Sequence, residues 1–111
     1  MKPKTSNYFM VFVASANRRE AIELARLLID RRVAACVNML PPMTSVFRWK
    51  GKVQSAKETL LIIKTTGSRY RDLEKMISSN HSYEVPEIIA IRIDRGLNQY
   101  LGWVNRETSI S

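Results

Sequence analysis

The sequence of 111 residues predicts an α+β domain in which two helices pack on one face of an antiparallel sheet, a split βαβ arrangement. Apolar runs typical of strands alternate with helical patterns in the order β-α-β-β-α-β-α. No linker, repeat or low-complexity segment divides the chain. The length therefore fits one domain over residues 1–111, with a core at about residues 8–105 and polar termini.

The first strand and the first helix are predicted near the start of the chain. Residues 8–13 form a continuous apolar run with aromatic side chains, which is typical of a buried strand. Asn17 can cap a helix, and Glu20 stands three residues later, as in a capping box. Arg31-Arg32 suit the negative end of that helix. Its apolar face consists of Ala21, Leu24, Ala25 and Leu28.

A long hairpin is predicted in the centre of the chain. Residues 33–40 favour a strand that Pro41-Pro42 interrupt, because neither proline nitrogen can donate a hydrogen bond. The strand resumes over residues 43–49, and Lys50-Gly51-Lys52 predict a tight turn into a third strand that ends with residues 59–66. A hairpin that projects past the helices exposes apolar surface and strand edges, which another subunit would cover.

The second half of the chain repeats the helix-strand order. Gly67-Ser68 break the third strand and are the predicted cap of a second helix. Residues 78–82 are predicted to form a polar loop, residues 88–93 a fourth strand, and residues 94–96 a turn. The tail from residue 106 to residue 111 is predicted to be frayed. The apolar positions of the two helices are Tyr70, Leu73, Met76 and Ile77, and then Leu97, Tyr100, Leu101 and Val104.

The composition limits the classes of partner and compartment. The net charge of +8 favours anions, nucleic acid or an anionic membrane, although the basic residues are dispersed as on an ordinary solvated surface. A single cysteine, Cys36 in an apolar run, excludes an intramolecular disulfide and suits a reducing compartment. Since no apolar run approaches the length of a membrane span, the sequence predicts no membrane partner.

Four motifs resemble the divalent-cation tolerance protein CutA (CutA1) family. They occur in the same order as in the family, and the resemblance runs from about residue 8 to residue 104. It implies a ferredoxin-like fold in a tight homotrimer similar to the PII signalling proteins, with the long hairpin packed across subunit interfaces. The motifs are Arg31-Arg32-Val33-Ala34-Ala35-Cys36-Val37-Asn38, Pro41-x-x-Thr44-Ser45-x-x-Arg48-Trp49-x-Gly51-Lys52, Leu61-Ile62-Ile63-Lys64-Thr65 and Tyr83-Glu84-Val85-Pro86-Glu87.

The resemblance also implies a role in the response to divalent metal ions. Members of the family are linked to tolerance of copper and other divalent cations, and the bacterial members are cytoplasmic. This implies a cytoplasmic protein that binds copper, another divalent cation or a small ligand at clefts between subunits. The sequence holds no G-x-S-x-G, H-E-x-x-H, Walker or GxGxxG motif, so we predict that the chain is not an enzyme.

His81, the only histidine, and Glu84 are the predicted metal ligands. An imidazole and a carboxylate suit Cu(II) or Zn(II), but the remaining ligands would have to come from a neighbouring subunit or water. Copper-binding members of the family carry a cysteine on the first strand and two adjacent histidines in this loop. Here Val13-Ala14 and Asn80-His81 stand at those places. The alternative is a histidine that packs in a loop or an interface.

The predicted ligand-binding residues are Tyr83, Glu84, Lys64 and Trp49. A phenol and the carboxylates of Glu84 and Glu87 at an inter-subunit cleft would hold a small polar ligand. The alternative is that Tyr83 packs in the interface and Glu84 pairs with a basic residue. For Trp49 the alternative is interface packing, and for Lys64 it is a strand end with the ammonium in water.

The alternative function is that of a basic ferredoxin-like module that binds RNA or another anion. RNA-recognition domains of this fold class carry a basic-Gly-aromatic run on the third strand. Residues 53–66 contain no aromatic side chain. The sequence therefore predicts no specific nucleic acid partner.

Overall fold

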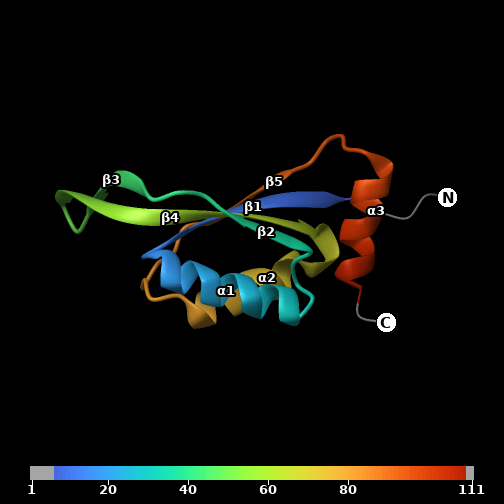
Figure 1. Cartoon of the computed structure of the whole chain (residues 1–111). Helices are drawn as coiled ribbons and strands as arrows, with labels where there is room; N and C mark the ends of the chain where they lie inside the picture. Colours follow the sequence, from blue (N-terminus) through green and yellow to red (C-terminus); the bar gives the residue numbers. More distant parts are fainter. Residues whose placement is uncertain (1–6, 110–111) are drawn as a thin grey trace.

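The computed structural model describes residues 7–109 and confirms the α+β prediction. The strands are β1 (Tyr8–Ser15), β2 (Cys36–Met39), β3 (Met43–Trp49), β4 (Lys52–Thr66) and β5 (Ile88–Arg92). The helices are α1 (Arg18–Asp30), α2 (Gly67–Asn80) and α3 (Asn98–Glu107). Helices α1 and α2 lie together on one side of the sheet, and α3 lies at its end (Figure 1).

The sheet has the strand order β2-β4-β1-β5, and all its pairs are antiparallel. Strand β4 is 15 residues long, so its second half pairs with β1 and β2 while its first half pairs with β3. The β3–β4 hairpin consequently projects beyond the helices (Figure 1). The molecule measures 51 Å along its longest axis against 25 and 23 Å along the others. The projecting hairpin agrees with the sequence prediction.

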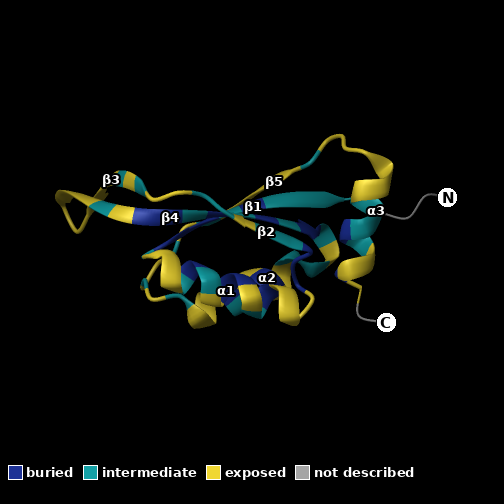
Figure 2. Ribbon diagram, in the orientation of Figure 1, coloured by how far each residue is buried: buried dark blue, intermediate teal, exposed yellow. Residues whose placement is uncertain are grey.

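The core lies between the sheet and the helices α1 and α2. Successive side chains of a strand point to opposite faces, so alternate positions of β1 and β4 face the helices. Figure 2 shows the buried residues concentrated between these layers. The fully buried residues that meet there include Val11, Val13, Leu61, Ile63, Leu28, Leu73 and Ile77.

Helix α1 ends in a Schellman motif, which delays the second strand. The Val33 N–H donates to the Leu28 carbonyl and the Arg32 N–H to the Ile29 carbonyl, each at 3.1 Å. Arg32 has φ 58°, a left-handed conformation that no strand accommodates. Because the Val33 N–H is used by the end of α1, the prediction that the strand begins at residue 33 is wrong, and β2 begins at Cys36.

The hairpin turn has the predicted position. Trp49 pairs with Lys52, which leaves two residues in the loop. Lys50 and Gly51 have φ values of 51° and 82°, as a type I′ turn requires. Glycine adopts this conformation without the steric cost that a side chain brings.

The polar segment after the apolar face of α2 is helical, so the loop predicted over residues 78–82 is wrong for its first part. The Ser79 hydroxyl donates to the Lys75 carbonyl at 2.9 Å, and the Asn80 amide donates to the Met76 carbonyl at 2.8 Å. These side chains bond to the preceding turn of their own helix and do not terminate it. The helix therefore runs to Asn80.

Two other helix ends differ from the prediction. Gly67-Ser68 do end the strand, but they lie inside α2, and Thr66 occupies the N-cap position. At the C-terminus, Thr108 is 1% exposed and its hydroxyl donates to the Val104 carbonyl at 2.9 Å, so the start of the predicted frayed tail is packed. The end of that tail, residues 110–111, lies outside the described residues.

The face of the sheet opposite α1 and α2 is largely apolar, with Asn38, Glu58 and Lys64 as polar members. Met10 and Phe12 alternate with the buried Val11 and Val13, and directly opposite strand partners share a face. Ile89 and Ile91 on this face are 55% and 53% exposed, and Figure 2 shows β5 as an exposed edge. We call this surface the open sheet face. Its apolar members are Met10, Phe12, Leu60, Ile62, Ile89 and Ile91.

Candidate functional site

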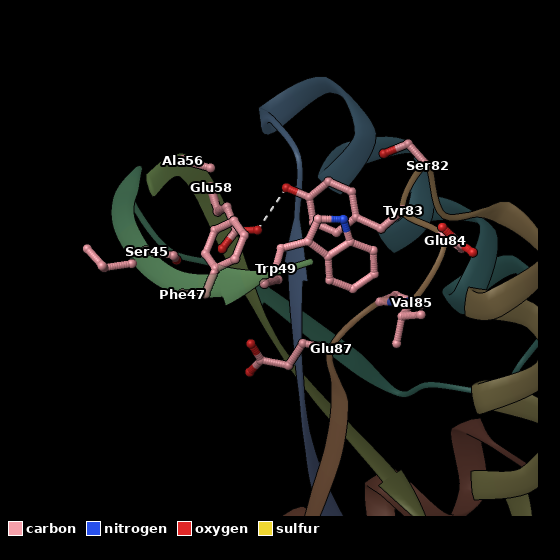
Figure 3. A pocket seen from close by; sticks show the side chains of 13 residues that line it. Ser45, Phe47, Trp49, Ala56, Glu58, Ser82, Tyr83, Glu84, Val85 and Glu87 are labelled. Atoms are coloured by element: carbon pink, nitrogen blue, oxygen red, sulfur yellow. Dashed lines mark hydrogen bonds between the residues drawn. The ribbon is translucent and has the colours of Figure 1, made fainter. Parts of the chain in front are cut away.

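A cavity of about 730 Å³ lies between the β3–β4 hairpin and the loop before β5. Its lining combines three aromatic rings with three carboxylates (Figure 3). Within the described part of the chain, residues 7–109, its lining includes no lysine, arginine or histidine. The hairpin contributes Ser45, Val46, Phe47, Trp49, Ala56 and Glu58, β1 contributes Ala14, and the loop contributes residues 82–87.

A hydrogen bond between Tyr83 and Glu58 joins the loop to the hairpin. The Tyr83 hydroxyl donates to Oε2 of Glu58 at 2.8 Å, drawn as the dashed line in Figure 3. Glu58 is only 7% exposed. Burial raises the pKa of Tyr83 to about 12, and the hydrogen bond to Glu58 and its charge act in the same direction. The phenol is therefore a hydrogen-bond donor over the physiological pH range.

Replacing Tyr83 by Phe is expected to lower stability by about 1–2 kcal/mol at pH 8, because a nearly buried carboxylate loses its donor. The folded-state pKa lies above the ordinary value of 10.0, so this contribution is present below pH 10 and is lost as pH rises through about 12. The difference in free energy of unfolding between wild type and Tyr83→Phe should shrink over that range. Urea unfolding followed by circular dichroism measures it, and a constant difference contradicts the assignment.

The side chain of His81 is fully buried, and its ring centroid lies 4.9 Å from that of Tyr83, which lines the cavity. Its Nε2 is 2.8 Å from the Ala14 carbonyl, and its Nδ1 accepts from the Tyr83 N–H at 3.0 Å. A backbone N–H can only donate and a carbonyl can only accept, so the ring is neutral and Nε2 carries the proton. The Nε2 contact holds the loop against β1, and the Nδ1 contact fixes the ring within the loop. A metal ion would have to displace one of these bonds.

Glu20 connects the start of α1 to the same loop. Its Oε1 accepts from the Ala16 N–H at 2.9 Å and its Oε2 from the Ser82 N–H at 2.8 Å. Burial acts to raise the pKa of Glu20, but these hydrogen bonds outweigh it and lower that pKa. The predicted capping box is present in one half, because Asn17 accepts from the Glu20 N–H at 2.9 Å. In the other half, the Glu20 carboxylate accepts from the N–H of Ala16, one residue before the N-cap, and not from the N–H of the N-cap Asn17.

The structure brings together three of the four predicted ligand-binding residues. Tyr83, Glu84 and Trp49 line the cavity, whereas Lys64 does not. The Lys64 ammonium donates to the side chain of Asn38 on the neighbouring strand β2. Within one chain, the four predicted ligand-binding residues therefore do not form one site, because Lys64 lies apart from the cavity.

Two site residues, Glu58 and Glu20, did not emerge as site residues from the sequence. Glu58 alternates with Leu60 and Ile62 along β4, so a carboxylate occupies a position of the apolar open sheet face. That break in an apolar pattern was the available signal. Glu20 carried a signal only as a cap, because its second partner, Ser82, lies 62 residues away.

The predicted metal ligands do not form a metal site within one chain. Both nitrogens of His81 are engaged, and Glu84 is exposed. Among residues 7–109, no group of three His, Cys, Asp or Glu side chains is placed to hold a metal ion. Transition metals usually require three or four such ligands. Metal binding through His81 and Glu84 stays a prediction, and it requires a rearranged or assembled protein.

Similar proteins support the family that the motifs suggested. The sequence model for "CutA1 divalent ion tolerance protein" matches residues 9–107. The chain is 43% identical to "Protein CutA, chloroplastic" of Arabidopsis thaliana over 95% of its length, which is 58% of that relative. The crystal structure of CutA1 from Oryza sativa superposes with a TM-score of 0.92 at 40% identity, covering 98% of this chain and 100% of that one.

Other relatives bear on length and compartment. The chain spans 54% to 62% of the length of several plant and animal relatives. The "periplasmic divalent cation tolerance protein CutA" from Archaeoglobus fulgidus has a TM-score of 0.89 at 32% identity, over 92% of this chain and 99% of that one. Since relatives are named chloroplastic and periplasmic, the cytoplasmic location of this chain stays a prediction. No helix within residues 7–109 is long and apolar enough to cross a membrane.

These names describe tolerance of cations and state no reaction, and the prediction that the chain is not an enzyme stays a prediction. The fold prediction is confirmed, because the sheet order and the superposition agree with the ferredoxin-like architecture of CutA1 structures. The motifs, the fold and the match over residues 9–107 lead to one conclusion. The chain belongs to the CutA1 divalent ion tolerance protein family.

Proposed function

We propose that this chain acts in divalent-cation tolerance as a homotrimer with a PII-like signalling architecture, which binds a small ligand at clefts between its subunits. The observation that carries the proposal is that the cavity and the exposed apolar surface share the same residues. Val46 and Val85 are 70% and 67% exposed, Phe47 and Trp49 are 39% and 37% exposed, and all four line the cavity. Apolar surface beside a polar cavity suits a site that assembly completes.

The open sheet face supports assembly independently of the cavity. It places six apolar side chains on the side of the sheet away from α1 and α2. Burying apolar surface contributes roughly 25 cal/mol per Å², so covering this face with other copies would stabilise the fold. The number of three copies comes from the family resemblance. The open sheet face gives the reason for assembly, because contact with other copies would bury its apolar side chains.

The role in divalent-cation tolerance comes from the family, and the cavity is the proposed ligand site. Copper binding is not part of this proposal, because both ring nitrogens of His81 are engaged in hydrogen bonds within the chain. The proposal therefore places binding at the residues around Tyr83 and Trp49.

A native mass spectrum with and without Cu(II) tests the assembly and the copper site together. We expect a species of three times 12.8 kDa, with the same copper uptake in wild type and in His81→Ala. A monomer at micromolar concentration contradicts the proposed assembly. Three coppers per trimer that disappear in His81→Ala would instead establish the metal site predicted from the sequence, and would require His81 to leave its present bonds.

A further inference from the structure

The carboxylate of Glu58 has little compensation for its burial. Glu58 is 7% exposed, and within residues 7–109 its side chain accepts one hydrogen bond, from the Tyr83 hydroxyl to Oε2. No ion pair to Glu58 exists within that part of the chain. A carboxylate has about four acceptor positions, and buried charges are normally paired. Glu58 therefore lacks a cationic partner.

The second oxygen of Glu58, Oε1, is not fully buried. Among the described residues, no fully buried side-chain nitrogen or oxygen lacks a hydrogen-bond partner. Oε1 accepts no bond there, so it keeps some accessible surface, and Glu58 lines the cavity. The cavity thus presents a hydrogen-bond acceptor with negative charge and without a donor.

The lining of this cavity suits an organic cation. The rings of Trp49, Phe47 and Tyr83 line the same cavity as the Glu58 carboxylate (Figure 3). Aromatic faces attract cations, and Trp49 already does so, because Lys50 Nζ lies 5.7 Å from its ring centroid. The chain has a net charge of +8. The cavity has the opposite charge, because three carboxylates line it and no basic residue of the described part does.

We propose that this cavity binds a primary alkylammonium ion, whose ammonium donates to Oε1 of Glu58 and whose alkyl chain packs against the apolar lining of the cavity. The inference rests on the proposed function in one respect, which is that the cavity is a ligand site. A quaternary ammonium has no N–H to donate to Oε1. A transition metal ion needs more ligands than the described residues bring together.

The test uses the indole N–H signals of the two tryptophans in a ¹H-¹⁵N NMR spectrum, assigned with Trp103→Phe. The full chain is titrated at low ionic strength and pH 7 with n-butylammonium, with n-butanol, which lacks the charge, and with tetramethylammonium, which lacks the donor. We expect n-butylammonium to shift the Trp49 signal at concentrations at least about tenfold lower than either control, since charge-assisted bonds are the stronger ones.

Glu58→Gln tests the charge while preserving an acceptor for Tyr83. We expect this variant to weaken n-butylammonium binding about tenfold or more. Glu23→Gln is the matched control, because it removes the same charge from an exposed position outside the cavity, and it should leave binding unchanged.

Several results would overturn the assignment. Equal binding of n-butanol would show a purely apolar cavity, and equal binding of tetramethylammonium would remove the role of the donor. An unchanged affinity in Glu58→Gln, or no response of Trp49, would also overturn it.

The mass of the same samples is measured separately. A trimer that binds nothing contradicts only this inference, whereas a monomer contradicts the assembly and leaves the titration valid, since every named contact lies in one chain.

Discussion

Replacing Ile89 by Asp is expected to convert the assembled protein into monomers of 12.8 kDa. Ile89 lies on the open sheet face, opposite Phe12, and is 55% exposed in the single chain. The substitution is therefore tolerable for the chain by itself. In an assembly that covers this face, each copy would bury an unpaired carboxylate, at a cost of at least several kcal/mol.

Light scattering after size exclusion measures this result. Ile29→Asp is the matched control, because Ile29 is 42% exposed on α1 and lies outside the open sheet face. We expect the control to keep the mass of the wild type. An Ile89→Asp protein with an unchanged oligomeric mass would show that assembly uses another surface.

Replacing Glu20 by Ala is expected to lower the free energy of unfolding by about 1–3 kcal/mol at pH 7. The carboxylate accepts from two backbone donors, of which Ala16 N–H is part-buried and Ser82 N–H is exposed to water, and a buried donor without a partner costs about 1–3 kcal/mol. The lowered pKa of Glu20 sets the pH dependence. Its contribution is present above the ordinary value of 4.5 and is lost as pH falls below it through the folded-state pKa.

Urea unfolding of Glu20→Ala at pH 7 and at acidic pH measures both effects. Glu23→Ala is the control, since the Arg19–Glu23 pair spans 3.8 Å with side chains 90% and 72% exposed. We expect it to change stability by less than about 0.5 kcal/mol. Equal effects of the two substitutions would contradict the role of Glu20. Glu20→Ala should also loosen the loop that carries Tyr83, because Ser82 and His81 precede it directly.

The elements of the fold follow largely from local patterns in the sequence. The cap at Asn17 and the turn at Lys50-Gly51 depend on residues within three or four positions of one another. The apolar face of α1 depends only on helical spacing. The errors also have local causes. The Val33 N–H bonds to the end of α1 and not to a strand, and the Ser79 hydroxyl bonds to the preceding turn of α2.

The sequence by itself determined the family, the order of the elements and the loop in which the site lies. Tertiary structure alone decided which side chains meet. Tyr83 reaches Glu58 across 25 residues, Ser82 reaches Glu20 across 62, and His81 reaches Ala14 across 67. Periodicity and capping encode neighbours within a turn or a strand, whereas these partners depend on strand register and on the packing of a helix against the sheet. For that reason His81 proved to be a loop anchor, and Glu58 emerged only in three dimensions.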